Sequence, residues 1–351
     1  MKGLPSSIQK EAPDSKDLLS AEELERQLNH WPVPSFSAAG DVMTGGRALK
    51  VQKKEGWDYP FRSVRPLLKR SSIVLANLEG PFAQRALLQP RYYSYQVNPK
   101  LAQALAEAGV TIMTLANNHL LDCGREGVLE TLEAAKEAKI ATIGAGVNQE
   151  EAHLPFIRQV GPWRIGFLGY YWNRRTAATA ELPGSAMDTE EDLARDIRQL
   201  KTLADRIVVT FHWGVPYERM PAETDQHKAR YAIDCGADIV IGHHPHVIQR
   251  FEIYRNRPIF YSLGNFAFGS GNSRAEGLLV SVSFEADGIE CLVIPIYVKN
   301  RDPRVNFQPK VLAGNGGSAV ISLLKDLSGK DGEVIQIHDG WGFLRLQQVS
   351  S

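Results

Sequence analysis

The sequence has few cysteines, no excess of charge of either sign and no long apolar run. Its 351 residues include only three cysteines, Cys123, Cys235 and Cys291, and equal numbers of acidic and basic residues. The cysteines are far apart and form no close pair for a zinc clip or a disulfide framework, which favours a reducing compartment. Balanced charge provides no basic surface for a nucleic-acid backbone, so we expect no nucleic-acid partner.

The sequence also lacks a segment that we expect to enter or cross a membrane. The N-terminal stretch MKGLPSSIQKEAPDSKDLLS has no apolar core of a secretion signal. No run of about eighteen apolar residues, the length that a spanning helix needs, occurs elsewhere. We therefore expect a cytoplasmic globular protein, long enough for one large domain or two ordinary ones. These features do not determine its oligomeric state.

Apolar runs typical of buried strands alternate with amphipathic segments. The runs are SFSAAGD, SIVLANLEG, VTIMTLANNH, RIVVTFHWG and ADIVIGHH. Helical spacing of Leu, Ala and Ile predicts helices over 99–108, 124–138, 189–204 and 222–235. This alternation predicts α/β layers. Beyond Arg250, FEIYRNRPIFYSLGNF and GLLVSVSFEADGIECLVIPIYV predict antiparallel strands, the second with a hairpin turn at 286–288.

Residues 1–34 form a polar, proline-containing arm that we expect to be peripheral. Within the arm, Ser20 and Glu23 have the spacing of a capping box. This motif predicts a short helix over 21–30.

Polar side chains follow five of the apolar runs. In chain order they are Asp41, then Asn77 and Glu79, then Asn117, Asn118, His119 and Asp122, then His212, and finally His243, His244 and His246. Ligands of open α/β sheets bind beyond the carboxyl ends of the strands, so we expect these groups to meet at one edge. Imidazole with carboxylate and amide oxygen, and no thiolate, favours manganese, iron or zinc in an open catalytic site.

An ordered set of motifs resembles a known family. The segments GDVMTGGR, NLEG, NNHLLDCG, HWGVPYE, GADIVIGHHPHVIQ and YSLGNF resemble those of the CapA- or PgsA-type bacterial capsule-synthesis proteins, which are associated with poly-gamma-glutamate capsules and are similar to calcineurin-like metallophosphatases. The resemblance implies an α/β (α+β) fold, a four-layer sandwich of two mixed β-sheets flanked by helices. It covers residues 35–300, and we expect residues 301–351 to pack on that domain as an extension. Family members are expected to be membrane-anchored or exported.

The resemblance also implies a set of metal ligands for one or two divalent ions. The set is Asp41, Glu79, Asn118, His212, His244 and His246. The first position uses Glu79, Asn118, His212 and His244. A second, weaker position uses Asp41, Glu79 and His246.

Two further points concern these predicted ligands: one departure from the phosphatase pattern, and the backbone that carries two of the imidazoles. Met43 stands where the phosphatase pattern has a histidine, and a thioether is a poor ligand for these cations. We expect the backbone of His244, Pro245 and His246 to be extended, which places both imidazoles on one face. His243 is then expected to point away, toward backbone or a supporting partner.

The same resemblance suggests catalytic and substrate-binding residues. His119 matches the general acid, and Glu218 either replaces the missing imidazole or acts as a base. Arg47, Arg174 and Arg175 are suited to hold an anionic group such as phosphate or carboxylate. The implied activity is hydrolysis of a phosphoester or a glutamyl amide by a metal-activated water. The alternatives are a non-catalytic capsule-assembly subunit and a cytosolic binder of an anionic peptide or polymer.

The remaining polar and aromatic candidates are expected to be structural. Asn117 braces a turn and Asp122 caps the helix near Gly124; His30, His153, His227 and His338 are hydrogen-bonded structural residues. Residues 261–268 are expected to form a strand and turn in the core, with Asn265 inside or outside the site. Trp213 and Tyr217 either pack in the interior or form walls for the substrate.

Overall fold

The computed structural model describes residues 12–90, 94–271, 273 and 276–347, so the first part of the arm, residues 1–11, lies outside it. The helices are α1 (Ala21–Leu28), α2 (Ala48–Glu55), α3 (Arg65–Leu68), α4 (Lys100–Ala108), α5 (Gly124–Glu137), α6 (Gln149–Ala152), α7 (Glu190–Leu200), α8 (Glu223–Cys235) and α9 (Gly314–Ser328), with the short 3-10 turns η1 (Ser15–Asp17), η2 (Tyr59–Phe61) and η3 (Gly329–Val334). The strands are β1 (Phe36–Met43), β2 (Val74–Leu78), β3 (Ile112–Thr114), β4 (Ala141–Ile143), β5 (Ala145–Gly146), β6 (Phe156–Val160), β7 (Trp163–Tyr171), β8 (Gly184–Ser185), β9 (Arg206–His212), β10 (Ile239–His243), β11 (Phe251–Tyr254), β12 (Arg257–Phe260), β13 (Asn265–Phe268), β14 (Glu276–Phe284), β15 (Gly288–Tyr297), β16 (Lys310–Val311), β17 (Gln336–His338) and β18 (Trp341–Gln347).

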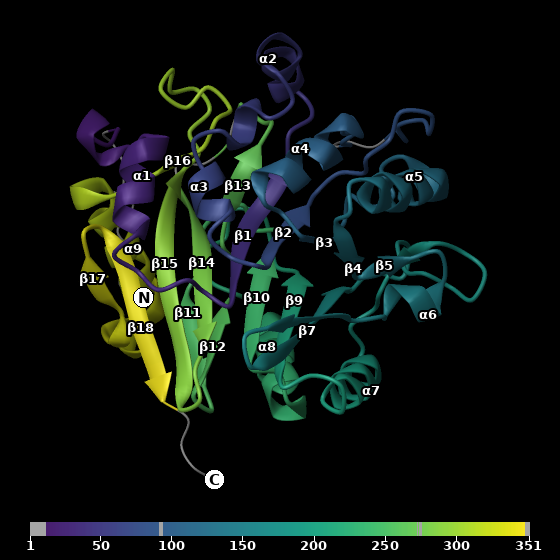
Figure 1. Cartoon of the computed structure of the whole chain (residues 1–351). Helices are drawn as coiled ribbons and strands as arrows, with labels where there is room; N and C mark the ends of the chain where they lie inside the picture. The colour runs from purple at the N-terminus through teal and green to yellow at the C-terminus, as the bar shows by residue number, and fades with distance from the viewer. Residues whose placement is uncertain (1–11, 91–93, 272, 274–275, 348–351) are drawn as a thin grey trace.

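Two large sheets form the centre of the molecule (Figure 1). The larger sheet has the order β17-β18-β15-β14-β1-β2-β3-β4, with β13 paired to β1 and β16 paired to β15. The smaller sheet has the order β11-β12-β10-β9-β7-β6. Each sheet contains both parallel and antiparallel pairs. The prediction of two mixed sheets is therefore confirmed.

Apolar side chains cover both faces of each sheet, because successive strand residues point to opposite sides. Leu75 and Val208 belong to the core that lies between the sheets. Ala76, next to Leu75, packs with the helices α4 and α5, whereas Val209 packs with α7 and α8. In Figure 1, α4 and α5 lie in the upper part of the molecule and α7 and α8 in the lower part. The result is the four-layer sandwich that the family resemblance implies.

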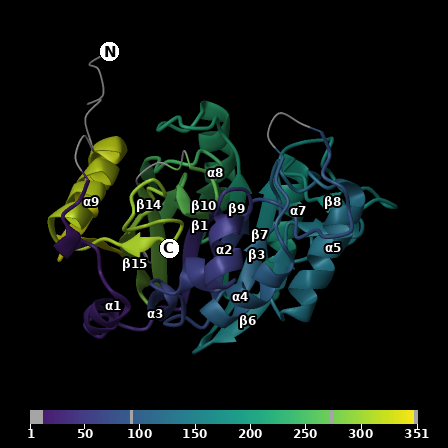
Figure 2. The same cartoon turned by 90° about the horizontal axis from the view of Figure 1, so that it is seen from above.

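Helix α9 closes one end of the sandwich. Its Ile321 is buried in the core between the sheets, and α9 contacts β11, β15 and β18. Figure 2 shows α9 at the opposite end of the molecule from α5. The described part of the N-terminal arm joins this end, where Leu18 forms a β-bridge with Leu312. Helix α1 buries Leu24 and Leu28.

Local signals in the sequence set several element boundaries. Ser20 accepts a hydrogen bond from the Glu23 backbone N–H, and Glu23 accepts one from the Ser20 N–H, so the capping box is confirmed. The predicted hairpin is also present, since β14 and β15 pair up to Phe284 and Ile289. Helix α7 ends at Leu200, four residues before the predicted end at 204.

The prediction of antiparallel strands after Arg250 is wrong for β13. Strand β12 belongs to the smaller sheet, whereas β13 pairs with β1 in the larger sheet and runs parallel to it. The chain crosses between the sheets at Gly264, whose positive φ of 69° suits glycine. Its carbonyl accepts the Asp41 N–H at 3.0 Å. The crossing places Asn265 beside Asp41 in register.

We predict that Phe36→Ala destabilises the fold by about 3–5 kcal/mol, because it removes a large side chain and leaves a cavity. Phe36 is fully buried between the sheets and meets the Phe167 ring edge-on, with 5.4 Å between the ring centroids. Urea denaturation measures the loss. Leu129→Ala is the control, because Leu129 on α5 is 45% exposed, and we expect a change within about 0.5 kcal/mol. Equal losses in the two variants contradict this account of the core.

Candidate metal centre

The site lies where the carboxyl ends of strands from both sheets meet. Asp41 belongs to β1, and Glu79 directly follows the neighbouring parallel strand β2. His212 and His243 end the parallel strands β9 and β10 and lie in register with each other. The loop after β3 carries Asn117, Asn118, His119 and Asp122. The expectation that these polar clusters meet at one edge is therefore confirmed by the fold.

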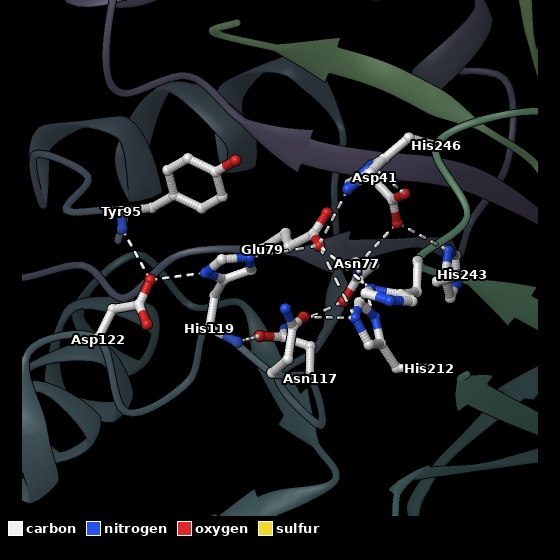
Figure 3. Close-up of polar contacts among 12 residues, drawn as sticks. Asp41, Asn77, Glu79, Tyr95, Asn117, His119, Asp122, His212, His243 and His246 are labelled. Carbon is white, nitrogen blue, oxygen red and sulfur yellow. Dashed lines mark hydrogen bonds and ion pairs between the residues drawn. The ribbon is translucent and has the colours of Figure 1, made fainter. Parts of the chain in front are cut away.

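The carboxylate of Glu79 lies at the centre of this group (Figure 3). Its side chain is fully buried, and neither of its oxygens has a hydrogen-bond partner among the described residues. Four imidazole nitrogens surround Oε1, at 3.6 Å for His246, 3.7 Å for His212, and 4.0 Å for His244 and His119. A buried carboxylate without hydrogen bonds is unfavourable unless a cation compensates it.

The donor atoms form two groups that fit a divalent cation. Glu79, His212 and His244 form one group, and Asp41, Glu79 and His246 form the other, with the donor atoms of each group within 4.8 Å of one another. Asn118 Oδ1 lies 2.7 Å from His212 Nε2. All six side chains predicted as ligands thus lie together. The unpartnered oxygens of Glu79 and the absence of cysteine from both groups fit manganese, iron or zinc.

Asp41 is held from three sides. Asn77 donates a hydrogen bond to Asp41 Oδ1 at 2.8 Å, and His246 Nδ1 lies 3.2 Å from Oδ2. His243 Nδ1 lies 3.5 Å from Oδ1, so His243 supports Asp41 and does not turn to the backbone. Burial alone raises the pKa of Asp41, but His243 and His246 outweigh it and hold the pKa well below its usual value. Asp41 is therefore an ionised member of the second group.

Burial and mutual charge shift the pKa values of the other members in different directions. Burial raises the pKa of Glu79 well above its usual value. Burial lowers the pKa of His212, and together with the nearby His246 it lowers the pKa of His244 to about 4. Burial opposes the charged form of His246 as well, yet Glu79 and Asp41 raise its pKa to about 9. Burial thus disfavours charge on Glu79 and His212, whereas the neighbouring carboxyl groups favour a proton on His246.

The backbone at His244 and His246 is not extended, so that prediction is wrong. The φ angles are 99° at His244 and 56° at His246, in the region that favours glycine. Such a conformation costs about 1–3 kcal/mol per residue and persists where the surroundings impose it. The Tyr217 N–H donates to the Pro245 carbonyl at 2.7 Å and holds this turn. The turn directs both imidazoles toward Glu79.

Met43 does not take part in the centre. Its side chain is 1% exposed and belongs to the apolar cluster on the outer face of the larger sheet. The second group thus contains a single imidazole, that of His246.

His119 is oriented by a buried carboxylate. Asp122 Oδ2 lies 2.6 Å from His119 Nδ1 and also accepts the Tyr95 N–H at 2.7 Å. The predicted capping role of Asp122 is wrong, since the residue before α5 is Cys123 and makes no side-chain cap. Asn117 Oδ1 accepts the His119 N–H at 3.1 Å, which confirms that Asn117 braces the turn. With Nδ1 bonded to Asp122, His119 Nε2 faces Glu79 (Figure 3).

Two cavities border the centre. One of about 480 Å³ lies on the His119 side, and Tyr217 and Asn265 line it. The other, of about 850 Å³, has Trp213 in its wall beside His212. Asn265 therefore lies inside the site, and its Oδ1 is 3.0 Å from His246 Nδ1. Trp213 also packs in the interior, where it stacks on Phe211 with 4.6 Å between the ring centroids.

The structure does not bring the other predicted residues to the centre. Glu218 is exposed and lines neither cavity, and its hydrogen bonds among the described residues are made by its backbone, with Val215 at 3.2 Å and with Gln249 at 2.9 Å. Arg47, Arg174 and Arg175 are likewise exposed and line neither cavity.

The histidines that we expected to be structural have partners away from the Glu79 carboxylate. His153 Nδ1 lies 2.6 Å from Asp196, His227 Nε2 lies 2.9 Å from Glu190, and His338 Nε2 lies 3.4 Å from Gln336. The backbone N–H of His30 donates to Gln27 after the last turn of α1.

Sequence reasoning missed Tyr95, whose ring lies 4.3 Å from that of His119. The stretch around Tyr95 forms no helix or longer strand in the described residues, and periodicity therefore gave no signal there. The sequence placed Asn77 at this edge but indicated no partner for it. The side chain of Asn117 donates to Asn77 Oδ1 and links the loop after β3 to strand β2.

Comparisons with known proteins agree with this architecture. The chain is an α/β protein with two mixed sheets, in which carboxylate and imidazole groups gather at the strand ends as candidate metal ligands. The family model "Bacterial capsule synthesis protein PGA_cap" matches residues 35–270. The chain therefore belongs to the bacterial capsule-synthesis family PGA_cap, as the motifs predict.

Individual relatives give the same result. The chain is 35% identical to the capsule biosynthesis protein CapA of Bacillus anthracis, over 77% of this chain and 69% of that protein. It is 33% identical to the PGA biosynthesis protein CapA of Bacillus subtilis, over 73% of this chain and 69% of that protein. Among solved structures, a 5'-nucleotidase of Candida albicans aligns with a TM-score of 0.42 and 12% identity, over 73% of this chain and 49% of that one.

No described helix combines the length and the apolarity needed to span a bilayer.

We predict that Glu79→Gln removes metal binding and makes the metal-free protein more stable. The glutamine amide is a weaker ligand than a carboxylate. The substitution also removes a buried carboxylate that has no hydrogen bond, which we expect to raise the free energy of unfolding by about 1–3 kcal/mol. Elemental analysis after purification without chelators measures the metal, and urea denaturation measures the stability. Glu218→Gln serves as the matched control and is expected to retain the metal. A Glu79→Gln protein that still holds metal argues against this centre.

We also predict that metal binding releases at least one proton near neutral pH. The pKa of His246 is about 9, so its imidazole is protonated below that pH and must lose a proton to bind a cation. Affinity for zinc or manganese should therefore rise as the pH increases toward 9. Calorimetric titration in two buffers of different ionisation enthalpy counts the released protons. Binding that is independent of pH contradicts the ligand role of His246.

Proposed function

We propose that this chain is a metal-dependent hydrolase that cleaves a phosphoester or a glutamyl amide bond of an anionic substrate, in poly-gamma-glutamate metabolism. The observation that carries the proposal is the buried, unpartnered Glu79 carboxylate within 4.0 Å of four imidazole nitrogens. A site built only for structure usually satisfies its buried polar atoms. Buried polar atoms that lack hydrogen bonds and lie among other titratable groups beside a cavity mark a place for a ligand.

The residues that would hold a cation belong to the two groups already described. Glu79, His212 and His244, with the Asn118 amide beside them, form the first position. Asp41, Glu79 and His246 form the second. When bound, a divalent cation supplies Lewis acidity and a water molecule whose pKa is lowered toward neutrality.

His119 is the proposed proton donor to the leaving group. The contact of its Nδ1 with Asp122 fixes the ring orientation. Its Nε2 is then free to face the bond that breaks, at the wall of the 480 Å³ cavity. The neighbouring ring of Tyr95 shields this side of His119. The chain thus provides an oriented acid beside the metal ligands.

The arginines suggest a path for an anionic chain. Asn173 lines the cavity next to His119, and Arg174 and Arg175 follow it on the exposed surface. An extended anionic substrate that leaves the cavity past Asn173 meets these two positive charges. In this proposal they attract and steer the substrate and do not touch the bond that breaks.

The alternative is a non-catalytic protein that binds an anionic polymer in capsule assembly. Met43 favours it, because the second group lacks one imidazole and the thioether is buried away from the centre. A metal that binds without any turnover of phosphodiester or gamma-glutamyl substrates would support this alternative.

We predict that His119→Gln lowers kcat by about 10²–10⁴-fold, the usual contribution of a general acid, and leaves the metal content unchanged. Hydrolysis of bis-p-nitrophenyl phosphate and of a gamma-glutamyl peptide by the metal-loaded protein supplies the rates. Asp122→Asn should lower kcat less, because it only loosens the orientation of His119.

The control for this experiment is His153→Gln. His153 forms a similar pair with Asp196, also at 2.6 Å, far from the ligands in the sequence and outside both cavities that border the centre. It tests whether the loss of any buried histidine–aspartate pair lowers the rate. Similar kcat values for His119→Gln and the wild type would exclude His119 as the acid.

A further inference from the structure

The larger cavity beside the metal ligands has a wall unlike that of the smaller one. Tyr171, Trp172 and Trp213 provide aromatic surface, and His212 and His244 form the border with the metal centre. The Trp172 side chain is 50% exposed, so it stands at the mouth of the cavity. A volume of about 850 Å³ is typical of sites that bind small molecules.

Acidic groups predominate in this wall. Asp188, Glu190, Glu223 and Asp225 line it, together with Lys228. The Lys228 ammonium group lies 2.7 Å from Asp188 Oδ2 and 4.9 Å from the centre of the Trp172 ring. Glu190 pairs with His227 on the rim at 2.9 Å. The Lys228 ammonium group is therefore paired with Asp188, whereas Asp225 has no ion-pair partner among the described residues.

Asp225 is buried and incompletely satisfied. It is 7% exposed, and its Oδ2 atom has no hydrogen-bond partner among the described residues. Asp188 is 4% exposed, and its Oδ1 atom also has no hydrogen-bond partner among the described residues. Burial raises the pKa of both carboxyl groups although Lys228 acts in the opposite direction, so their ionised forms lack full compensation. A hydrogen-bond donor with a positive charge would supply it.

The position of Asp225 links this acidic wall to the metal centre. Asp225 lies in the first turn of α8, and its Oδ2 faces Gly214, two residues after His212. A Cβ atom at Gly214 would lie 3.4 Å from this oxygen. A ligand seated against Asp225 is therefore close to the loop that follows a metal ligand.

We propose that this cavity binds a primary ammonium group of the substrate, with Asp225 and Asp188 as acceptors and Trp172 as an aromatic wall. The inference rests on the proposed function, because the same cavity borders His212 and His244. For a glutamyl amide, the ammonium group is the free amine at the amino end of the chain. The enzyme then acts on bonds near that end, and not at random along the polymer.

The test compares two ligands that differ only in the amine. The probes are gamma-glutamylglutamate and its des-amino analogue glutarylglutamate, titrated by calorimetry into the full-length metal-loaded protein. We expect the wild type to bind the amine at least about tenfold more tightly, the usual worth of one charge-assisted hydrogen bond. Asp225→Asn should abolish this preference.

Asp234→Asn is the matched control, because Asp234 lies on the same helix and pairs with Arg255 at 3.0 Å. It should keep the tenfold preference. Equal affinities for the two probes in the wild type, no binding of either probe, or a preference that survives Asp225→Asn would each overturn the proposal. The comparison of the two probes in the wild type does not depend on whether a variant folds.

Turnover is measured separately with the same two probes. A preference for the amine without hydrolysis supports the ammonium site and rejects hydrolysis of the glutamyl amide. Hydrolysis of both probes with equal KM values rejects the ammonium site and leaves the hydrolase proposal standing.

Discussion

The Glu79 carboxylate is removed from water and has no hydrogen bond from any described residue. The free energy of such a group is unfavourable unless positive charge is placed near it. Imidazoles at or just after the ends of three different buried strands approach it to 4.0 Å or less. The arrangement of both sheets can be understood as the framework that holds opposing donors around this one carboxylate.

Two features of the backbone make that convergence possible. The crossing of the chain at Gly264 takes it from the smaller sheet to the larger one and sets Asn265 beside Asp41. The turn at Pro245 places His244 and His246 in an unusual conformation and directs both toward Glu79. Strain of this kind is typical of functional sites, where the fold holds residues in positions that local preference disfavours. His244 lines both cavities, so the centre borders open space on two sides.

Much of the candidate site could be predicted because its residues directly follow apolar runs. Glu79 and His212 occupy such positions, and the rule that ligands bind beyond strand ends assigns them to one edge. Asp122 was predicted to be a helix cap because its position just before α5 fits that role locally. Its actual contact, with His119, depends on how the loop after β3 folds back. Tyr95 and Asp225 gave no signal, since their contacts join segments distant in the chain.

The sequence by itself determined the order of strands and helices, the capping box at Ser20 and the residue types at each strand end, because hydrophobic periodicity and local hydrogen bonds act over a few residues. Only the tertiary structure decided which of these groups meet. Arg47 and Glu218 matched the motifs as well as His212 did, yet they lie on the surface. The pairing of β13 with β1, the turn at Pro245 and the acidic cavity depend on contacts between remote segments. The free energy of those contacts comes from the packing of two complete sheets, which no local pattern encodes.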